Sequence, residues 1–244
     1  MSAPRIAIFA GPSLPAVARP RDQRFHWRSP AAAGDIADLR HDPPAALCLI
    51  DGLFEACPAP WHKELMLLMA AGTRVYGASS MGALRAAELD RHGMIGIGAI
   101  YRAYRDRQLT GDDEVALIHG PERLDWAPLS VPLVEVRATL IAVVRTGLLS
   151  VPQARSMRSA AAAIHFAARD WPALRARWLG EGHCDAATAE AVANAHVPLK
   201  RQDALACIDV AVRRCAEAPS PTPPAPPAPP LTSFLRRLLV ERAG

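Results

Sequence analysis

Three short apolar runs, each closed by a glycine or an aspartate, constrain the fold most strongly. They cover residues 5–10, 46–50 and 73–78, and short apolar runs of this kind are typical of buried parallel strands. Helix patterns over residues 31–39, 61–71 and 81–89 alternate with them. This alternation predicts an α/β fold with a Rossmann-like parallel sheet flanked by helices.

The second half of the chain has a different pattern. It is rich in Ala and Arg and predicts helices over residues 133–146, 152–168, 172–179, 186–195 and 201–216. We therefore expect an α/β core over residues 1–130 and a helical C-terminal region over residues 131–217.

The C-terminus carries a proline-rich segment and a short apolar pattern. Eight prolines lie within residues 219–230, which predicts a stiff polyproline II linker over residues 218–230. Leucines and Phe234 then recur at helical spacing, so residues 231–244 predict an amphipathic tail helix. Such a helix either docks on a partner, folds back on its own core or stays disordered, because an isolated helix of this length is marginal.

Composition excludes several classes of protein. Half of the residues are hydrophobic, and the net charge of +4 comes from arginines interleaved with acids, so we expect no nucleic-acid partner. Five cysteines without a CxxC pair favour a reducing cytoplasm over a disulfide framework or a zinc knuckle. We expect neither export nor a membrane span, because no signal-like or long uncharged apolar run occurs.

Unusual loops follow all three predicted strands. Their sequences are Gly-Pro-Ser at residues 11–13, Asp-Gly-Leu-Phe-Glu at residues 51–55, and Ala-Ser-Ser-Met-Gly at residues 78–82; we call the last one the serine turn. Ligands of open parallel sheets bind beyond the carboxyl ends of the strands. The sequence therefore predicts that these loops converge on a functional site, with Ser13 and Asp51 as supporting residues.

The serine turn resembles the sharp strand-to-helix turn that presents a catalytic serine. Ser80 occupies the nucleophile position, with Ser79 as the alternative, and the backbone N–H groups of Met81 and Gly82 are candidates for binding an oxyanion or carboxylate. An ordinary helix N-cap explains either serine equally well.

Few residues are candidates for the base that would take the proton of this serine. Lys63 and Lys200 are the only lysines, and Lys63 lies in the first turn of the helix after the Asp51 loop. Since a buried lysine can give up its proton whereas arginine cannot, Lys63 is the candidate base of a Ser–Lys pair. The alternative is an ordinary salt bridge from Lys63 to Asp51, Glu55 or Glu64.

Other site chemistries are weaker. Asp51, Glu55 and residues 112–114 permit a magnesium site with oxygen ligands, although such acids more often cap helices or pair with arginines such as Arg85 and Arg137. The histidines lack zinc-ligand spacing, and the glycines of residues 93–98 indicate a turn, not a dinucleotide fingerprint. We therefore expect no metal and no cofactor.

Several motifs, taken together, resemble the TfuA family. They are IFAGPSL (8–14), GDI (34–36), IDGLFE (50–55), HKE (62–64), VYGASSMGALRAAEL (75–89), GMIGIGAIY (93–101) and DDEVAL (112–117). They cover most of residues 5–140 in order, whereas the linker and the tail lie outside the resemblance.

The resemblance implies a role beside YcaO enzymes, which activate a peptide amide with ATP for backbone thioamidation in the biosynthesis of modified peptides. The implied sulfur donor is a ThiS-like carrier protein with a C-terminal thiocarboxylate. A hydrolase-like Ser–Lys pair maps onto Lys63 with Ser79 or Ser80, and Ser13, Asp51 and Arg85 would orient the carrier tail or Lys63. The implied partners are YcaO, the carrier and the precursor peptide.

Two other functions compete with this hypothesis. The chain could be a non-catalytic adaptor that docks precursor peptide or carrier onto YcaO, with the serine turn as a carboxylate-binding nest. It could also be a small-molecule or phosphate hydrolase that uses the Gly-Pro-Ser loop. Thiocarboxylate hydrolysis predicts that sulfide release is lost when Lys63 or one of the serines is replaced. Neither the adaptor nor the small-molecule hydrolase predicts this loss.

Overall fold

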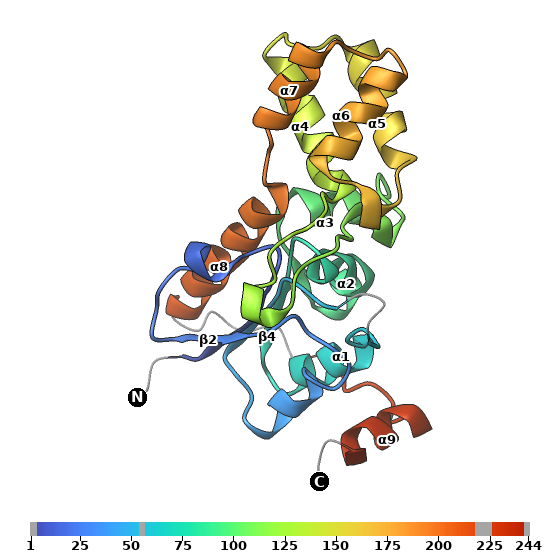
Figure 1. Ribbon diagram of the computed structural model, residues 1–244. Helices are drawn as coiled ribbons and strands as arrows, with labels where there is room; N and C mark the ends of the chain where they lie inside the picture. Colours follow the sequence, from blue (N-terminus) through green and yellow to red (C-terminus); the bar gives the residue numbers. More distant parts are fainter. Residues whose placement is uncertain (1–3, 54–56, 218–225, 242–244) are drawn as a thin grey trace. The chain divides into compact units, whose positions relative to one another are not determined.

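The structure is a computed structural model that describes residues 4–53, 57–217 and 226–241. The chain forms two compact units, one from residues 1–108 together with 200–244 and one from residues 109–199. Figure 1 labels the helices of both and two of the strands.

The first unit is built around a parallel sheet of five strands in the order β2-β1-β3-β4-β5. The strands are β1 (Ile6–Phe9), β2 (Phe25–Arg28), β3 (Ala46–Leu49), β4 (Arg74–Gly77) and β5 (Ile95–Gly96). The three predicted strands are β1, β3 and β4, and the Rossmann-like fold class is confirmed. The sequence missed β2 and β5, because β2 is a half-exposed edge strand and β5 has only two residues.

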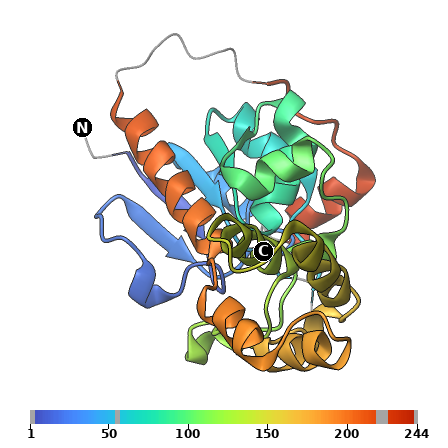
Figure 2. The same cartoon turned by 90° about the horizontal axis from the view of Figure 1, so that it is seen from above.

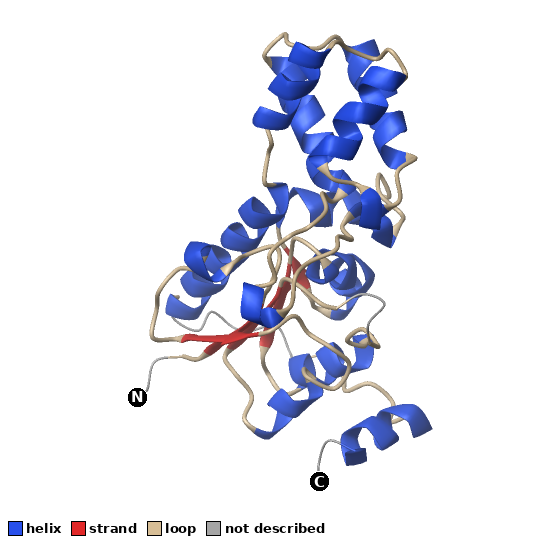
Figure 3. Cartoon of the chain, in the orientation of Figure 1, coloured by secondary structure: helices blue, strands red, loops and turns tan. Residues whose placement is uncertain are grey.

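Helices cover both faces of this sheet (Figures 2 and 3). Helix α8 (Leu199–Ala216) packs on one face, where Cys207 and Ile208 join Ile6, Ile8 and Cys48 in a buried cluster. On the other face lie α1 (His62–Ala70), α2 (Met81–Leu89) and α3 (Gly98–Arg105). Short 3-10 turns lie at Ala16–Ala18 (η1), Ala37–His41 (η2) and Asp90–His92 (η3).

Two local predictions in the first unit were wrong. The helix predicted over residues 31–39 is absent; Ala31 forms a bridge to Gly52, Gly34 has a φ of 95°, and only η2 follows. The turn predicted over residues 93–98 contains β5 and the start of α3, because Ile95 and Gly96 pair with β4. In both places pairing with a neighbouring segment overrides local propensity.

The second unit is helical. It contains η4 (Asp112–Glu114), η5 (Glu122–Leu124), α4 (Leu133–Arg145), α5 (Val151–Ala162), η6 (Phe166–Ala168), α6 (Trp171–Gly180) and α7 (Ala186–Asn194). Its core includes Leu140, Met157, Leu174 and Trp178, and the Trp178 indole donates to the carbonyl of Met157 at 2.9 Å. The helical C-terminal region is confirmed, but α8 groups with the sheet because its apolar face is buried there.

The tail helix is α9 (Ser233–Glu241), inside the predicted range of residues 231–244. The prediction of a polyproline II linker falls largely on residues 218–225, which lie outside the described residues. Among the described helices, none is long and apolar enough to cross a membrane.

Candidate functional site

The loops after β1 and β3 meet at the carboxylate of Asp51, which is buried. The Ser13 hydroxyl donates to Asp51 Oδ1 at 2.5 Å, and the N–H groups of Gly11 and Ser13 donate to Oδ2 at 2.8 and 3.0 Å. The strand order reverses direction between β1 and β3, which is where doubly wound sheets bind ligands. Asp51 and Ser13 thus hold the two loops of this switch point together.

The serine turn joins the same group of loops. The N–H of Gly82 donates to the carbonyl of Ile50 at 3.2 Å, and a Cβ at Gly52 would lie 2.8 Å from Cγ of Met81. The predicted convergence of the three strand-end loops is therefore confirmed for residues 11–13, 51–53 and 78–82, whereas Phe54 and Glu55 lie outside the described residues.

Ser79 is the strained residue of the turn. Its φ is 69°, in the left-handed region that costs a non-glycine residue about 1–2 kcal/mol. Its side chain is fully buried, and no described residue hydrogen-bonds its hydroxyl. A buried unsatisfied hydroxyl costs about 1–3 kcal/mol more. Strain and an orphaned polar group at one residue indicate a functional role.

Ser80 begins helix α2 as its N-cap residue, but its side chain makes no capping hydrogen bond. Its carbonyl accepts from the N–H groups of Ala83 and Leu84, and its own N–H donates to the carbonyl of Ala78 at 2.9 Å. The N-cap interpretation thus holds for the backbone of Ser80 and not for its hydroxyl, which is also buried.

The two predicted oxyanion donors differ. The Gly82 N–H is taken by Ile50, and a Cβ at Gly82 would lie 1.8 Å from the carbonyl oxygen of Leu49. Gly82 therefore allows α2 to approach β3, and its N–H does not face an open site. Met81 is the first residue of α2, and no described residue accepts its N–H, so this donor is left unpaired, as the first N–H groups of a helix are.

Lys63 lies in the first turn of α1 and is half-buried. Its amine contacts neither serine: Nζ lies 3.5 Å from the carbonyl oxygen of Pro230 and 3.4 Å from Oγ1 of Thr232. No described acidic residue forms a salt bridge with Lys63, so the alternative of a salt bridge to Asp51 or Glu64 is wrong. The Ser–Lys pair stays a prediction.

Arg85 links the helices that carry the two halves of the predicted pair. From α2, its Nε donates to the carbonyl of Pro60 just before α1 at 2.9 Å, and its Nη1 pairs with Glu88 at 2.7 Å. His62 of α1 also contacts Glu88 at 2.7 Å. Burial alone would raise the pKa of Glu88, but hydrogen bonding from His62 and attraction to Arg85 outweigh it and lower that pKa. Arg85 thus fixes the entry to α1 and contacts neither Lys63 nor Asp51.

Glu64 anchors the start of α1 from inside. Its buried carboxylate accepts the N–H groups of Trp61, Gly34 and Ala37 at 3.0, 2.8 and 3.2 Å. Burial raises the pKa of Glu64, and the three backbone donors offset part of this rise. The Glu64 carboxylate is thus occupied by backbone donors, and within the described residues no carboxylate pairs with Lys63.

The acidic residues fit the predicted structural role. In the helical unit, Arg137 Nε donates to Glu114 Oε2 at 2.8 Å. In the sheet unit, the Asp51 carboxylate accepts hydrogen bonds from backbone N–H groups and the Ser13 hydroxyl. Within the described residues, no group of three His, Cys, Asp or Glu side chains could hold a metal ion.

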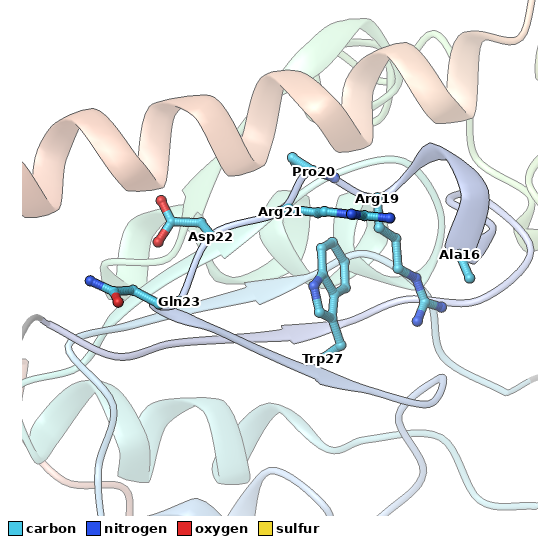
Figure 4. Close-up of a pocket in the computed structure, with 7 residues that line it drawn as sticks. All are labelled: Ala16, Arg19, Pro20, Arg21, Asp22, Gln23 and Trp27. Carbon is cyan, nitrogen blue, oxygen red and sulfur yellow. The ribbon is translucent and has the colours of Figure 1, made fainter.

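Two features escaped the sequence analysis. The first is a cavity of about 590 Å³ beside β2, lined by Ala16, Arg19, Pro20, Arg21, Asp22, Gln23 and Trp27. Figure 4 shows the side chains of Arg19, Arg21 and Trp27 close to one another, between Ala16 and Asp22. Arg19 binds the carbonyls of Leu14 and Ala10 at 3.1 Å and lies 5.0 Å from the Trp27 ring. No predicted site residue lines this cavity.

The second is a pair of buried polar residues, Lys200 and Asp203, near the start of α8. Asp203 accepts the N–H groups of Ala99 and Ile100 at 2.9 and 2.8 Å and caps α3; burial raises its pKa, while these donors oppose the rise. Lys200, three residues before Asp203, is also buried. Both residues belong to the Lys-Arg-Gln-Asp-Ala sequence at residues 200–204. This sequence does not follow a predicted strand, so the search for site residues in strand-end loops did not reach it.

The comparisons with known proteins bear on the region that holds the serine turn and Lys63. No curated protein matches the chain. A family model described as TfuA-like protein matches residues 51–170. The match includes Asp51, Lys63, Ser79, Ser80, Met81, Gly82 and Arg85, but not Ser13, the linker or the tail. Residues 51–170 of this chain are therefore TfuA-like, which confirms the family predicted from the motifs.

Proposed function

We propose that this protein is an accessory of YcaO-dependent peptide backbone thioamidation that hydrolyses the thiocarboxylate of a ThiS-like carrier and delivers the sulfide. The observation that carries the proposal is Ser79, with its strained backbone and its buried, unpartnered hydroxyl in the TfuA-like turn. This observation shifts the proposed nucleophile from Ser80 to Ser79, since the sharp strand-to-helix turn strains the residue it presents.

In the proposed acylation step, Ser79 Oγ attacks the thiocarboxyl carbon of the carrier while Lys63 takes the hydroxyl proton. The negative oxygen of the tetrahedral intermediate accepts a hydrogen bond from the N–H of Met81. The carbon–sulfur bond then breaks, and the sulfur leaves as hydrosulfide after it accepts the proton held by Lys63. The products of this step are an acyl-serine and hydrosulfide.

In the second step, water attacks the acyl carbon, Lys63 takes the water proton, and the carbon–oxygen bond to Ser79 breaks with return of that proton to the serine. The carrier leaves with an ordinary carboxylate. The hydrosulfide attacks the peptide amide that YcaO has activated, so we propose direct contact with YcaO and, through it, the precursor peptide. Asp51 and Ser13 position the loop beside the turn.

One observation favours a second candidate, the non-catalytic adaptor. Both serine side chains are buried, and the Lys63 amine contacts the tail instead of either serine. An adaptor needs no exposed nucleophile, whereas hydrolysis requires the carrier tail to reach the buried Ser79 hydroxyl and Lys63 to approach it.

Sulfide release from a thiocarboxylated ThiS-like carrier tests the proposal. The full chain is mixed with the carrier, and sulfide and carrier mass are followed over time. Lys63→Arg keeps the charge but removes the base, and Ser79→Ala removes the nucleophile. Ser159→Ala on an exposed part of α5 is the matched control. We expect both site variants to lose release and the control to keep it; no release by the wild type with YcaO and peptide present leaves the adaptor.

A further inference from the structure

Helix α9 folds back onto the unit that contains the serine turn (Figure 1). The Phe234 ring stacks on the Trp61 ring with centroids 3.3 Å apart and an angle of 22° between the rings. Leu235 is fully buried, and Nη2 of Arg40 donates to the carbonyl of Leu239 at 3.3 Å. The tail thus occupies a surface made by the start of α1 and by η2.

The start of α9 lies against Lys63. Thr232 precedes the helix, with its carbonyl and its hydroxyl accepting the N–H groups of Arg236 and Leu235 at 2.9 and 3.4 Å. The Lys63 amine contacts this hydroxyl and the carbonyl of Pro230. The residue proposed as the base is therefore in contact with the beginning of the tail helix.

This docking is shallow. Phe234 is 51% exposed and Val240 is 73% exposed, so Leu235 supplies most of the buried apolar anchor. The two Lys63 contacts are at the outer limit of hydrogen bonding, and a cation at the positive end of a helix is unfavourable. A nine-residue helix is also marginal by itself. These features are typical of a segment held by its tether and released by competition.

We propose that the surface around Trp61 is a helix-binding surface which the chain's own tail occupies, and that the occupied state covers the Lys63 amine. The surface fits a short amphipathic helix with an aromatic residue and a leucine in the positions of Phe234 and Leu235. A consequence is that the covered state releases no sulfide, and this consequence rests on the proposed function. The covering of the Lys63 amine by the tail does not depend on that function.

Lysine labelling tests the covering directly, because the chain has only two lysines. Lys200 is 2% exposed and reports on the integrity of the fold. The full-length chain is treated briefly with an amine-reactive ester, and modification of each lysine is measured by mass spectrometry. Leu235→Asp removes the apolar anchor, and Val240→Asp makes the same change at the exposed position of the same helix.

We expect Leu235→Asp to raise the labelling rate of Lys63 about tenfold through loss of the buried leucine, and Val240→Asp to leave it unchanged, with Lys200 protected in both. A synthetic peptide of residues 231–244, added to the Leu235→Asp chain, should restore protection of Lys63, whereas the same peptide with Leu235→Asp should not. Equal Lys63 labelling of wild type and Leu235→Asp, with Lys200 still protected, overturns the proposal.

Sulfide release by the same variants separates this proposal from the function it builds on. Leu235→Asp should release sulfide faster than wild type if Lys63 is the base. If Lys63 labelling rises and sulfide release does not, the helix-binding surface stands and the inactivity of the covered state is refuted. The hydrolase itself is refuted separately, if Lys63→Arg and Ser79→Ala keep the wild-type release.

Discussion

The serine turn and the start of α1 hold the two halves of the predicted Ser–Lys pair, and they are constrained in different ways. Ser79 is fixed by backbone packing: Gly77 and Gly82 let β4 and α2 approach so closely that a Cβ at Gly77 would lie 2.2 Å from the Gly82 carbonyl oxygen. Lys63 lies on a helix that is itself well anchored, yet among the described residues its amine makes two long contacts, both with the tail.

The difference indicates where the molecule can change. A turn held by interlocked backbone keeps its strain in every state that retains the sheet, whereas a lysine covered by a shallow helix is exposed when that helix leaves. We infer that the serine turn is preorganised, and that the proposed Ser–Lys pair depends on α9 and on the side chain of Lys63.

The largest effect expected is on catalysis by the two serines. Ser79→Ala removes the proposed nucleophile and should lower sulfide release about 10³-fold or more. Ser80→Ala removes a hydroxyl that makes no capping bond and should lower it less than about tenfold. Initial rates of sulfide release with the thiocarboxylated carrier measure both. The reverse order would return the nucleophile to Ser80.

The next effect is on the packing that preorganises the turn. Gly82→Ala places a Cβ 1.8 Å from the Leu49 carbonyl oxygen, which is backbone of a central strand and cannot move aside. We expect the free energy of unfolding to fall by about 3 kcal/mol, measured by urea denaturation. Gly147→Ala, at a glycine with φ of 79° and no atom near its Cβ, is the control and should cost about 1 kcal/mol. Similar losses in the two variants would argue against tight packing at the turn.

The sheet and the serine turn were accessible to sequence reasoning because their signals are local. The apolar runs of β1, β3 and β4 and the helix of α2 are set by the residues within them, and α2 has the predicted bounds of residues 81–89. Convergence of the three loops then follows from the parallel sheet alone.

Features that depend on distant partners were not accessible. Edge strand β2 and the two-residue β5 exist through pairing with β1 and β4, and the predicted helix over residues 31–39 is replaced by a bridge to Gly52. The contact of Lys63 with Pro230 and Thr232 joins residues more than 160 positions apart, so no pattern within either segment could reveal it.

The strain at Ser79 can itself be tested. Ser79→Gly relieves the left-handed backbone and removes the orphaned hydroxyl, gains that exceed the added flexibility of the unfolded chain. We expect the free energy of unfolding to rise by about 1 kcal/mol while sulfide release is lost. Ser80→Gly, where φ is −114°, gains no such relief and should be destabilised by about 0.5–1 kcal/mol. Thermal and urea denaturation check both, and a loss of stability in Ser79→Gly would contradict stored strain.

The smallest effect expected concerns pH and the anchor of α1. Because burial raises the pKa of Glu64 in the folded state, the fold favours its protonated form. Its contribution to stability is therefore fully present below the usual pKa of 4.5 and is lost as the pH rises through the raised value. The wild type should lose stability relative to Glu64→Gln over this window, as measured by urea denaturation at a series of pH values.

Glu88 provides a control of opposite sign for the same helix. Although burial opposes it, the pKa of Glu88 is lowered by His62 and Arg85, so its contribution is present above 4.5 and is lost as the pH falls through the lowered value. The wild type should therefore gain stability relative to Glu88→Gln as the pH rises. If both differences change in the same direction, Glu64 and Glu88 do not hold α1 in solution as they do in the structure. Lys63 then lies on a helix that is held less firmly than the serine turn.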